Sequence, residues 1–180
     1  MREQPPAKLG RQVVVMQTSM GAITLELDGD QAPVTVANFL KYVDSGHYKG
    51  TVFHRVIQTF MIQGGGFTRD LEEKPTQRAI QNEAGNGLRN LGGAIAMART
   101  GDPHSATAQF FINTKDNRGL DRDQCEDGCG YTVFGKVTAG MDVVRKIAAV
   151  RTGAAGPFDK DCPLEPVVIE SVTRQAPAAP

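Results

Sequence analysis

A single arginine stands among apolar residues in the run from Phe53 to Phe67. Arg55 follows His54, and further along Gln63 precedes three consecutive glycines. A charged side chain in an apolar β-type run is costly unless it stays solvated or has a partner. A partner that arrives with the substrate would explain this arginine, and the alternative is a solvated arginine on the outer face of a strand.

A second unusual segment lies downstream. Residues 94–99 (Ala-Ile-Ala-Met-Ala-Arg) lead through a loop to residues 106–113, which contain Gln109 and Phe111. Both segments therefore place a glutamine beside aromatic or methionine residues, since Phe60 and Met61 precede Gln63. If the segments are neighbours, they form a shallow apolar pocket ringed by arginine, amide and backbone donors. Taken singly, such residues are more often core or edge residues.

The sequence offers this pocket no nucleophile with its base. No G-x-S-x-G motif occurs, and no cysteine lies near a histidine in the sequence. Rotation about an X-Pro bond needs no nucleophile, metal or cofactor. Its barrier of roughly 18–20 kcal/mol arises because the nitrogen lone pair is shared with the carbonyl, and the uncatalysed event takes tens to hundreds of seconds.

A guanidinium that donates to the proline nitrogen would favour the twisted state, in which the lone pair is localised. One charge-assisted hydrogen bond of about 2–3 kcal/mol gives only roughly 30- to 150-fold in rate. Positioning and exclusion of water must supply the rest. The apolar walls are therefore as necessary as the arginine.

Short β-type runs and two helices must position these residues. In residues 22–27, for example, Ile23, Leu25 and Leu27 alternate with polar residues, as in a half-buried strand. Pro33 begins a helix that Gly46 ends, and residues 141–150 form the second helix. The expected strands are 13–18, 22–27, 51–57, 60–64, 94–98, 109–113, 131–137 and 167–173.

This order of elements predicts a mainly β fold, a closed eight-stranded antiparallel β-barrel capped by two α-helices. At 180 residues the chain is expected to form one domain. We expect a flexible N-terminal arm over residues 1–10, the folded domain over residues 11–174 and a disordered tail over residues 175–180.

Composition excludes several classes of function. Lys plus Arg and Asp plus Glu both total 20, so the net charge is zero, which disfavours nucleic-acid binding. No apolar stretch reaches membrane-spanning length and the start lacks an apolar signal region, so we expect no membrane association. Three cysteines fit a reducing compartment, and the cytoplasm is the expected location.

Cys125 and Cys129 raise two further hypotheses. Their C-x₃-C spacing, with Cys162 distant and no close histidine, does not predict a zinc site, and redox sensing by the pair stays open. The aspartates of this loop imitate a calcium loop, but neither register has both the glycine and the glutamate such a loop requires. We expect no metal and no cofactor.

Several segments together resemble the cyclophilin-type peptidyl-prolyl cis-trans isomerases. The resemblance runs in order from Val13 to Thr173. Its segments are FHRVI (53–57), FMIQGG (60–65), QFFI (109–112), VFGKV (133–137), APVTVANF (32–39) and LGGAIAMA (91–98).

The resemblance implies a capped eight-stranded barrel with the site on its outer face. It makes Arg55 the catalytic arginine and Gln63 its positioning amide. Residues implied to bind substrate are His54 at the pocket edge, Phe60, Met61, Phe111 and Leu120 around the proline, Ala98, Arg99 and Gln109 beside the preceding residues, and Tyr131, where many relatives carry histidine.

One position departs from the family. Gly119 stands where many members carry a bulky aromatic residue, often tryptophan, and this chain has no tryptophan. We therefore expect weakened cyclosporin binding and less effect on proline turnover. The loop 121–130 also looks longer than in compact relatives and resembles bacterial-type members.

The expected function is isomerisation of X-Pro bonds in unfolded or flexible protein segments, by a monomer that assists folding as a chaperone. The alternative is a proline-peptide binding module or holdase with little turnover.

Overall fold

The computed structural model of the chain describes residues 7–176; residues 1–6 and 177–180 lie outside that description. Its strands are β1 (Arg11–Thr18), β2 (Gly21–Asp28), β3 (Thr51–Ile57), β4 (Met61–Thr68), β5 (Ala94–Met97), β6 (Phe110–Asn113), β7 (Val133–Ala139), β8 (Thr152–Ala155), β9 (Phe158–Pro163) and β10 (Ile169–Gln175). The helices are α1 (Pro33–Asp44), α2 (Met141–Ala148) and the short 3₁₀ helix η1 (Arg118–Leu120).

Eight of these strands form one strongly curled antiparallel sheet. Their order is β10-β1-β2-β7-β5-β6-β4-β3. The two outer strands meet through the bridge between Val52 and Val168, and the Phe53 N–H donates to the Val167 carbonyl at 3.1 Å. The predicted eight-stranded antiparallel fold is confirmed, and its closure consists of these few contacts rather than a continuous ladder.

Large apolar side chains fill the interior of the curled sheet. Ile23, Leu25 and Leu27 of β2 are fully buried, as their alternation predicts. The aromatic ring of Phe39 from α1 lies 5.1 Å from that of Tyr48 and 5.2 Å from that of Phe134, measured between centroids. Helix α1 is therefore anchored in the same core as the strands.

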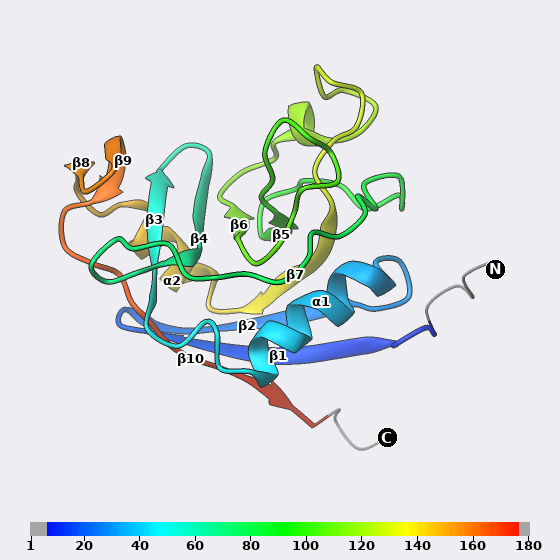
Figure 1. Ribbon diagram of the computed structural model, residues 1–180, viewed down its shortest axis with the longest axis horizontal. Helices are drawn as coiled ribbons and strands as arrows, with labels where there is room; N and C mark the ends of the chain where they lie inside the picture. Colours follow the sequence, from blue (N-terminus) through cyan, green and yellow to red (C-terminus); the bar gives the residue numbers. More distant parts are fainter. Residues whose placement is uncertain (1–6, 177–180) are drawn as a thin grey trace.

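The helices cover the sheet as the sequence predicts. Pro33 occupies the first turn of α1, where its missing N–H costs nothing. Helix α1 contacts β2 and β10, and α2 contacts β2, β3 and β4 (Figure 1). Helix α2 ends at Ala148, two residues before the expected end.

The hairpin β8–β9 was not predicted. Figure 1 shows it at the end of the molecule beside β3, whereas the loops around residues 100–130 gather beyond β5 and β6. Its strands are short, and apart from the buried Cys162 and Pro163 their residues are exposed or half-buried. They lack the apolar alternation that identifies a half-buried strand.

The proposed terminal segments lie partly outside the described residues. Within the predicted arm, Leu9 N–H donates to the Gly29 carbonyl at 3.3 Å, and Gly29 N–H donates to the Gly10 carbonyl at 2.9 Å. Strand β10 continues to Gln175, the first residue of the predicted tail. The domain boundaries stay a prediction.

Candidate active site

Arg55 and Gln63 are directly opposite each other on neighbouring strands. They pair in the register of β3 and β4. Arg55 is exposed between the buried residues His54 and Val56, so its side chain leaves the sheet on the outer face. Within residues 7–176 no hydrogen bond or ion pair engages its guanidinium, which keeps its donors free for a bound molecule.

Gln63 is fixed by a second glutamine. Its Nε2 donates to Oε1 of Gln109 at 3.0 Å. Gln109 reaches this position because Gly66 has no side chain: a Cβ there would lie 2.5 Å from Gln109 Cγ. Gly65 has φ +91°, and a Cβ would come 2.8 Å from the ring of Tyr48. The glycines after Gln63 therefore allow close approach of the backbone, as the sequence suggests.

Apolar side chains form the wall beside these polar groups. Met61 and Phe111 are buried in a cluster on the outer face of the sheet, and Phe60 and Leu120 pack on it. With them a cavity of about 130 Å³ is formed. Its lining residues are Arg55, Phe60, Met61, Gln63, Ala98, Arg99, Phe111, Leu120 and Tyr131.

Arg99 and Tyr131 close one side of this cavity. The Arg99 guanidinium carbon lies 4.3 Å from the centroid of the Tyr131 ring, whose edge meets Phe111. Arg99 Nη2 pairs with the Asp127 carboxylate at 2.5 Å and donates to the Gly130 carbonyl at 2.9 Å. Arg99 is thus a fixed part of the wall, in contrast to Arg55.

The carboxylate of Asp127 connects the 121–130 loop to the cavity. The Cys129 N–H and the Arg99 guanidinium donate to it, and these bonds hold the pKa of Asp127 well below its usual range. The loop therefore presents a charged anchor to Arg99 at all but strongly acidic pH.

A buried amide network also supports the site, and the sequence analysis missed it. Asn113 Nδ2 donates to Asn90 Oδ1 at 3.1 Å, and Asn117 Nδ2 donates to the Phe60 carbonyl at 2.8 Å. Asn90 in turn donates through its N–H to the buried Asp121 carboxylate at 2.7 Å. Asn90 and Asn113 are fully buried. Asn113 ends the apolar run of β6, whereas Asn90 follows Arg89 in a polar loop and has no sequence signal.

His54 is not among the residues that line the cavity, and its expected role at the pocket edge stays a prediction. The ring is buried, stacked on Phe158 at 5.1 Å and tilted against Phe67 at 4.6 Å. A register shift between Phe53 and Arg55 interrupts the strand alternation, and the unpredicted hairpin β8–β9 covers His54. Burial, and secondarily the charge of Arg55, lowers the pKa of His54 to about 4.

The structure also shows where Gln109 and Gly119 lie relative to the cavity. Gln109 acts through Gln63 and is not among the cavity-lining residues. Gly119 is exposed, and no atom lies within 4 Å of the position its Cβ would occupy. The outer side of the cavity next to Leu120 is therefore open where relatives carry a ring.

The described residues contain no candidate metal site, disulfide or membrane-spanning helix. Across residues 7–176 no cluster of three or more His, Cys, Asp or Glu side chains could hold a metal ion. Cys125, Cys129 and Cys162 are free thiols. Among the described helices none is long and apolar enough to cross a membrane.

Comparisons with known proteins agree on one family. The family described as cyclophilin type peptidyl-prolyl cis-trans isomerase/CLD matches residues 13–174. The peptidyl-prolyl cis-trans isomerase cyp18 of Streptomyces antibioticus is 60% identical over 159 residues, covering 88% of this chain and 95% of the relative. The peptidyl-prolyl cis-trans isomerase B of Escherichia coli is 52% identical over 162 residues, covering 89% and 98%.

Solved structures show the same likeness. The crystal structure of a cyclophilin-type isomerase from Cryptosporidium parvum matches with a TM-score of 0.74 and 25% identity, covering 92% of this chain and 98% of that one. A second structure of that protein, determined in the presence of the dipeptide Ala-Pro, matches equally well.

Proposed function

The chain belongs to the cyclophilin-type peptidyl-prolyl cis-trans isomerases, and on that premise we propose that Arg55 and Gln63 catalyse rotation of X-Pro bonds in unfolded or flexible protein segments. The observation that carries the assignment is the free Arg55 guanidinium at the rim of a proline-sized cavity with one apolar wall, formed by Met61 and Phe111. An apolar cavity of about 150 Å³ is large enough for benzene. The cavity of about 130 Å³ therefore suits one pyrrolidine ring.

Rotation requires the peptide nitrogen to lose its resonance with the carbonyl. With the proline ring against Met61 and Phe111, Arg55 donates to the nitrogen as its lone pair becomes localised. Gln63 is held in place by its hydrogen bond to Gln109 and positions the substrate beside Arg55, its partner across β3 and β4. The apolar wall keeps water from competing for the guanidinium, which strengthens this bond.

Removing the guanidinium tests these roles. We expect Arg55→Ala to lower kcat/KM on a proline-containing peptide by about 100-fold or more, since a charge-assisted bond in the twisted state is lost. Arg69→Ala is the matched control, because Arg69 is also exposed and follows β4. Equal turnover by wild type and Arg55→Ala, with both folded by circular dichroism, would overturn the mechanism.

The alternative function is a holdase that binds proline segments with little turnover. Under that alternative the chain suppresses aggregation but does not accelerate refolding limited by proline isomerisation. We expect wild type to accelerate such refolding and Arg55→Ala to lose the acceleration while still binding the peptide. Aggregation suppression without acceleration by wild type would favour the holdase.

The remaining expectations extend this proposal. We propose that the protein works as a monomer, binds proline-containing peptides, and is weakly sensitive to cyclosporin because the wall at Gly119 is missing. The odd number of cysteines supports a cytoplasmic location.

A further inference from the structure

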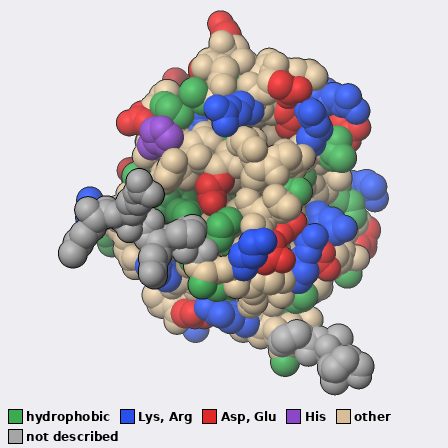
Figure 2. Space-filling model, turned by 90° about the vertical axis from the view of Figure 1, so that its right-hand side faces the viewer, with side chains coloured by type: hydrophobic (Ala, Val, Ile, Leu, Met, Phe, Trp, Pro, Cys, Tyr) green, Lys and Arg blue, Asp and Glu red, His purple; other side chains and the backbone are tan. Residues whose placement is uncertain are grey.

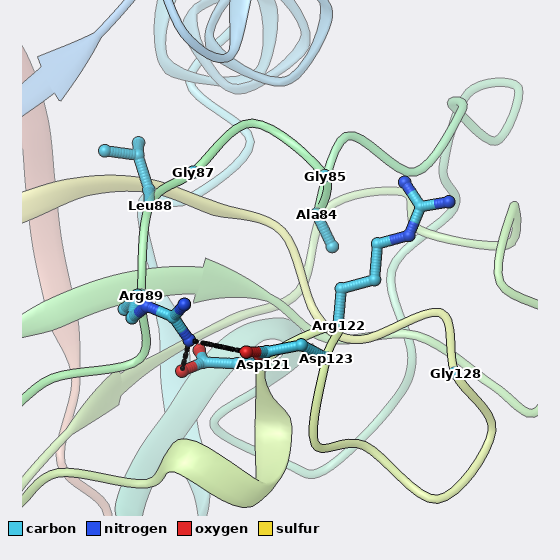
Figure 3. A pocket seen from close by; sticks show the side chains of 9 residues that line it. All are labelled: Ala84, Gly85, Gly87, Leu88, Arg89, Asp121, Arg122, Asp123 and Gly128. Carbon is cyan, nitrogen blue, oxygen red and sulfur yellow. Dashed lines mark hydrogen bonds and ion pairs between the residues drawn. The ribbon is translucent and has the colours of Figure 1, made fainter.

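A second depression, larger than the proline cavity, lies beside the 121–130 loop. Its volume is about 390 Å³. The loop 84–89 and the segment after η1 form its walls (Figure 3). Leu120 lines the proline cavity and the next residue, Asp121, lines this depression, so the two hollows share a wall.

The acidic groups of the depression are already engaged. Arg89 Nη1 contacts Asp121 Oδ2 at 3.4 Å and both carboxylate oxygens of Asp123, at 3.0 and 3.2 Å. The other oxygen of Asp121 accepts from Asn90 N–H at 2.7 Å. These contacts fix the loop and leave the aspartates no free oxygen for a cation.

Arg122, in contrast, is a free cation. Among the described residues no hydrogen bond or ion pair engages its side chain. Figure 3 shows its guanidinium on the far side of the depression from the Arg89 cluster, beside Gly85. A Cβ on Gly85 would meet Arg122 Nη1, the far end of an exposed and flexible side chain. The guanidinium therefore lies against the backbone of the 84–89 loop at Gly85.

Two backbone amides without a partner among the described residues belong to residues that line the same space. The N–H groups of Gly85 and Gly87 donate to no acceptor within residues 7–176. Leu88 and Ala84 supply a small apolar floor. A guanidinium with adjacent amide donors and no free acid is the chemistry that binds a carboxylate.

We propose that this depression is a subsite for an acidic side chain of the polypeptide whose proline occupies the cavity lined by Arg55. The inference rests on the proposed isomerase function. Consecutive Cα atoms are about 3.8 Å apart, so Arg122 lies close behind the Leu120 wall. An extended substrate advances about 3.3 Å per residue. The acidic residue therefore stands roughly three to five residues from the proline.

The test uses uncharged host peptides with one proline and a Glu placed in turn at each of these positions on either side. The matching Gln peptide is the reference. We expect one Glu position to lower KM about two- to fivefold at low salt with kcat unchanged, the range of a solvent-accessible ion pair. Arg122→Gln should abolish this preference, and the exposed α2 variant Arg145→Gln should keep it.

Two further variants separate charge from shape. Arg122→Glu should reverse the preference, so that a Lys peptide binds better than the Glu peptide. Gly85→Leu displaces the guanidinium from its position beside Gly85 and should weaken the preference, although Arg122 is still present.

Each result decides between the two proposals. If wild type turns over the Gln reference but shows no Glu effect at any position, or if the effect survives Arg122→Gln, the subsite is wrong and the isomerase function stands. If wild type does not turn over the Gln reference, the proposed function itself fails and the subsite falls with it.

Discussion

At the scale of single residues, the two arginines of the proline site have opposite environments. Arg99 is buried and bound to Asp127, Gly130 and the face of Tyr131. Arg55 is exposed and unpaired within residues 7–176. A guanidinium that already has partners would have to lose them before it could donate to a proline nitrogen. The difference in pairing therefore assigns the wall to Arg99 and the catalytic bond to Arg55.

The missing ring at position 119 gives the first prediction. Because no atom lies within 4 Å of the Cβ position, Gly119→Trp adds an indole without displacing the fold. We expect cyclosporin to bind about 5- to 30-fold more tightly, from ring contact and the indole N–H, with proline turnover changed less than about threefold. The sequence has no other tryptophan, so fluorescence titration measures binding directly.

The control for this prediction is Leu164→Trp, at an exposed site distant in sequence. Its fluorescence should not respond to cyclosporin. Equal inhibition of turnover by cyclosporin in wild type and Gly119→Trp would contradict the prediction.

His54 predicts a dependence of stability on pH. Burial holds its folded pKa at about 4, below the ordinary value of 6.5, so the unfolded chain binds more protons between these values. Stability is therefore full above about pH 6.5 and falls by roughly 3 kcal/mol as pH drops to about 4, at 1.36 kcal/mol per unit. Asp127 titrates below this window.

Urea unfolding at several pH values measures this slope. His54→Phe keeps a ring between Phe67 and Phe158 and cannot be protonated, so we expect a shallower slope. Burial also lowers the pKa of His47, which supplies part of what remains. His104→Gln changes an exposed histidine and should leave it unchanged. A His54→Phe variant with the slope of wild type would show that other groups cause it.

At the scale of elements, strand β6 carries two consecutive phenylalanines with different roles: one packs in the core and the other lines the cavity. Phe110 points inward, with ring centroids 5.6 Å from Tyr48 and 6.0 Å from Phe53. Phe111 points outward to the cavity and Tyr131. Successive strand residues face opposite sides of a sheet, so the same substitution should have different effects at the two positions.

We expect Phe110→Leu to lower the free energy of unfolding by about 1–2 kcal/mol and to leave KM unchanged below the unfolding transition. Phe111→Leu should raise KM about three- to tenfold, because an aromatic contact with the proline ring is lost. Denaturant unfolding and peptide kinetics on both variants test the pair. Similar changes in KM at both positions would contradict the inside–outside division.

How much of these elements the sequence reveals depends on burial. Alternation in β2 and the glycine-rich end of β4 predicted the strands, whereas the register that pairs Arg55 with Gln63 was not predicted. Phe60, expected to begin a strand, instead lies in the turn before β4, where its carbonyl accepts from Asn117. Such a contact between distant segments leaves no local pattern.

The position of His54 shows the same limit. Strict alternation places neighbours of Arg55 inside the sheet, but the environment of His54 is made by a hairpin 100 residues later in the chain. That hairpin is polar and short, so neither its existence nor its cover over His54 could be predicted. Side chains held by buried regular strands were predictable, and those held by irregular segments were not.

At the scale of the whole molecule, positive and negative side chains are mixed on the surface. Figure 2 shows Lys or Arg and Asp or Glu side chains interspersed on one face. Several are paired across elements, such as Arg174 with Asp44 at 2.6 Å and Arg11 with Asp28 at 2.8 Å. With zero net charge, no long-range field of one sign is expected to steer a substrate to the site.

Turnover of an uncharged peptide should therefore be nearly independent of salt. Between about 0.01 M and about 1 M salt the screening length falls from about 30 Å to about 3 Å. We expect kcat/KM on such a peptide to change less than about twofold, because the proline site uses a short-range donor and apolar walls. The KM advantage of a Glu peptide at Arg122 should disappear over the same range, since an exposed ion pair is screened. Single-stranded DNA should not be retained in filter binding even at low salt, as the absence of excess positive charge predicts. A steep salt dependence with the uncharged peptide would mean that a charged region beyond Arg55 governs its binding.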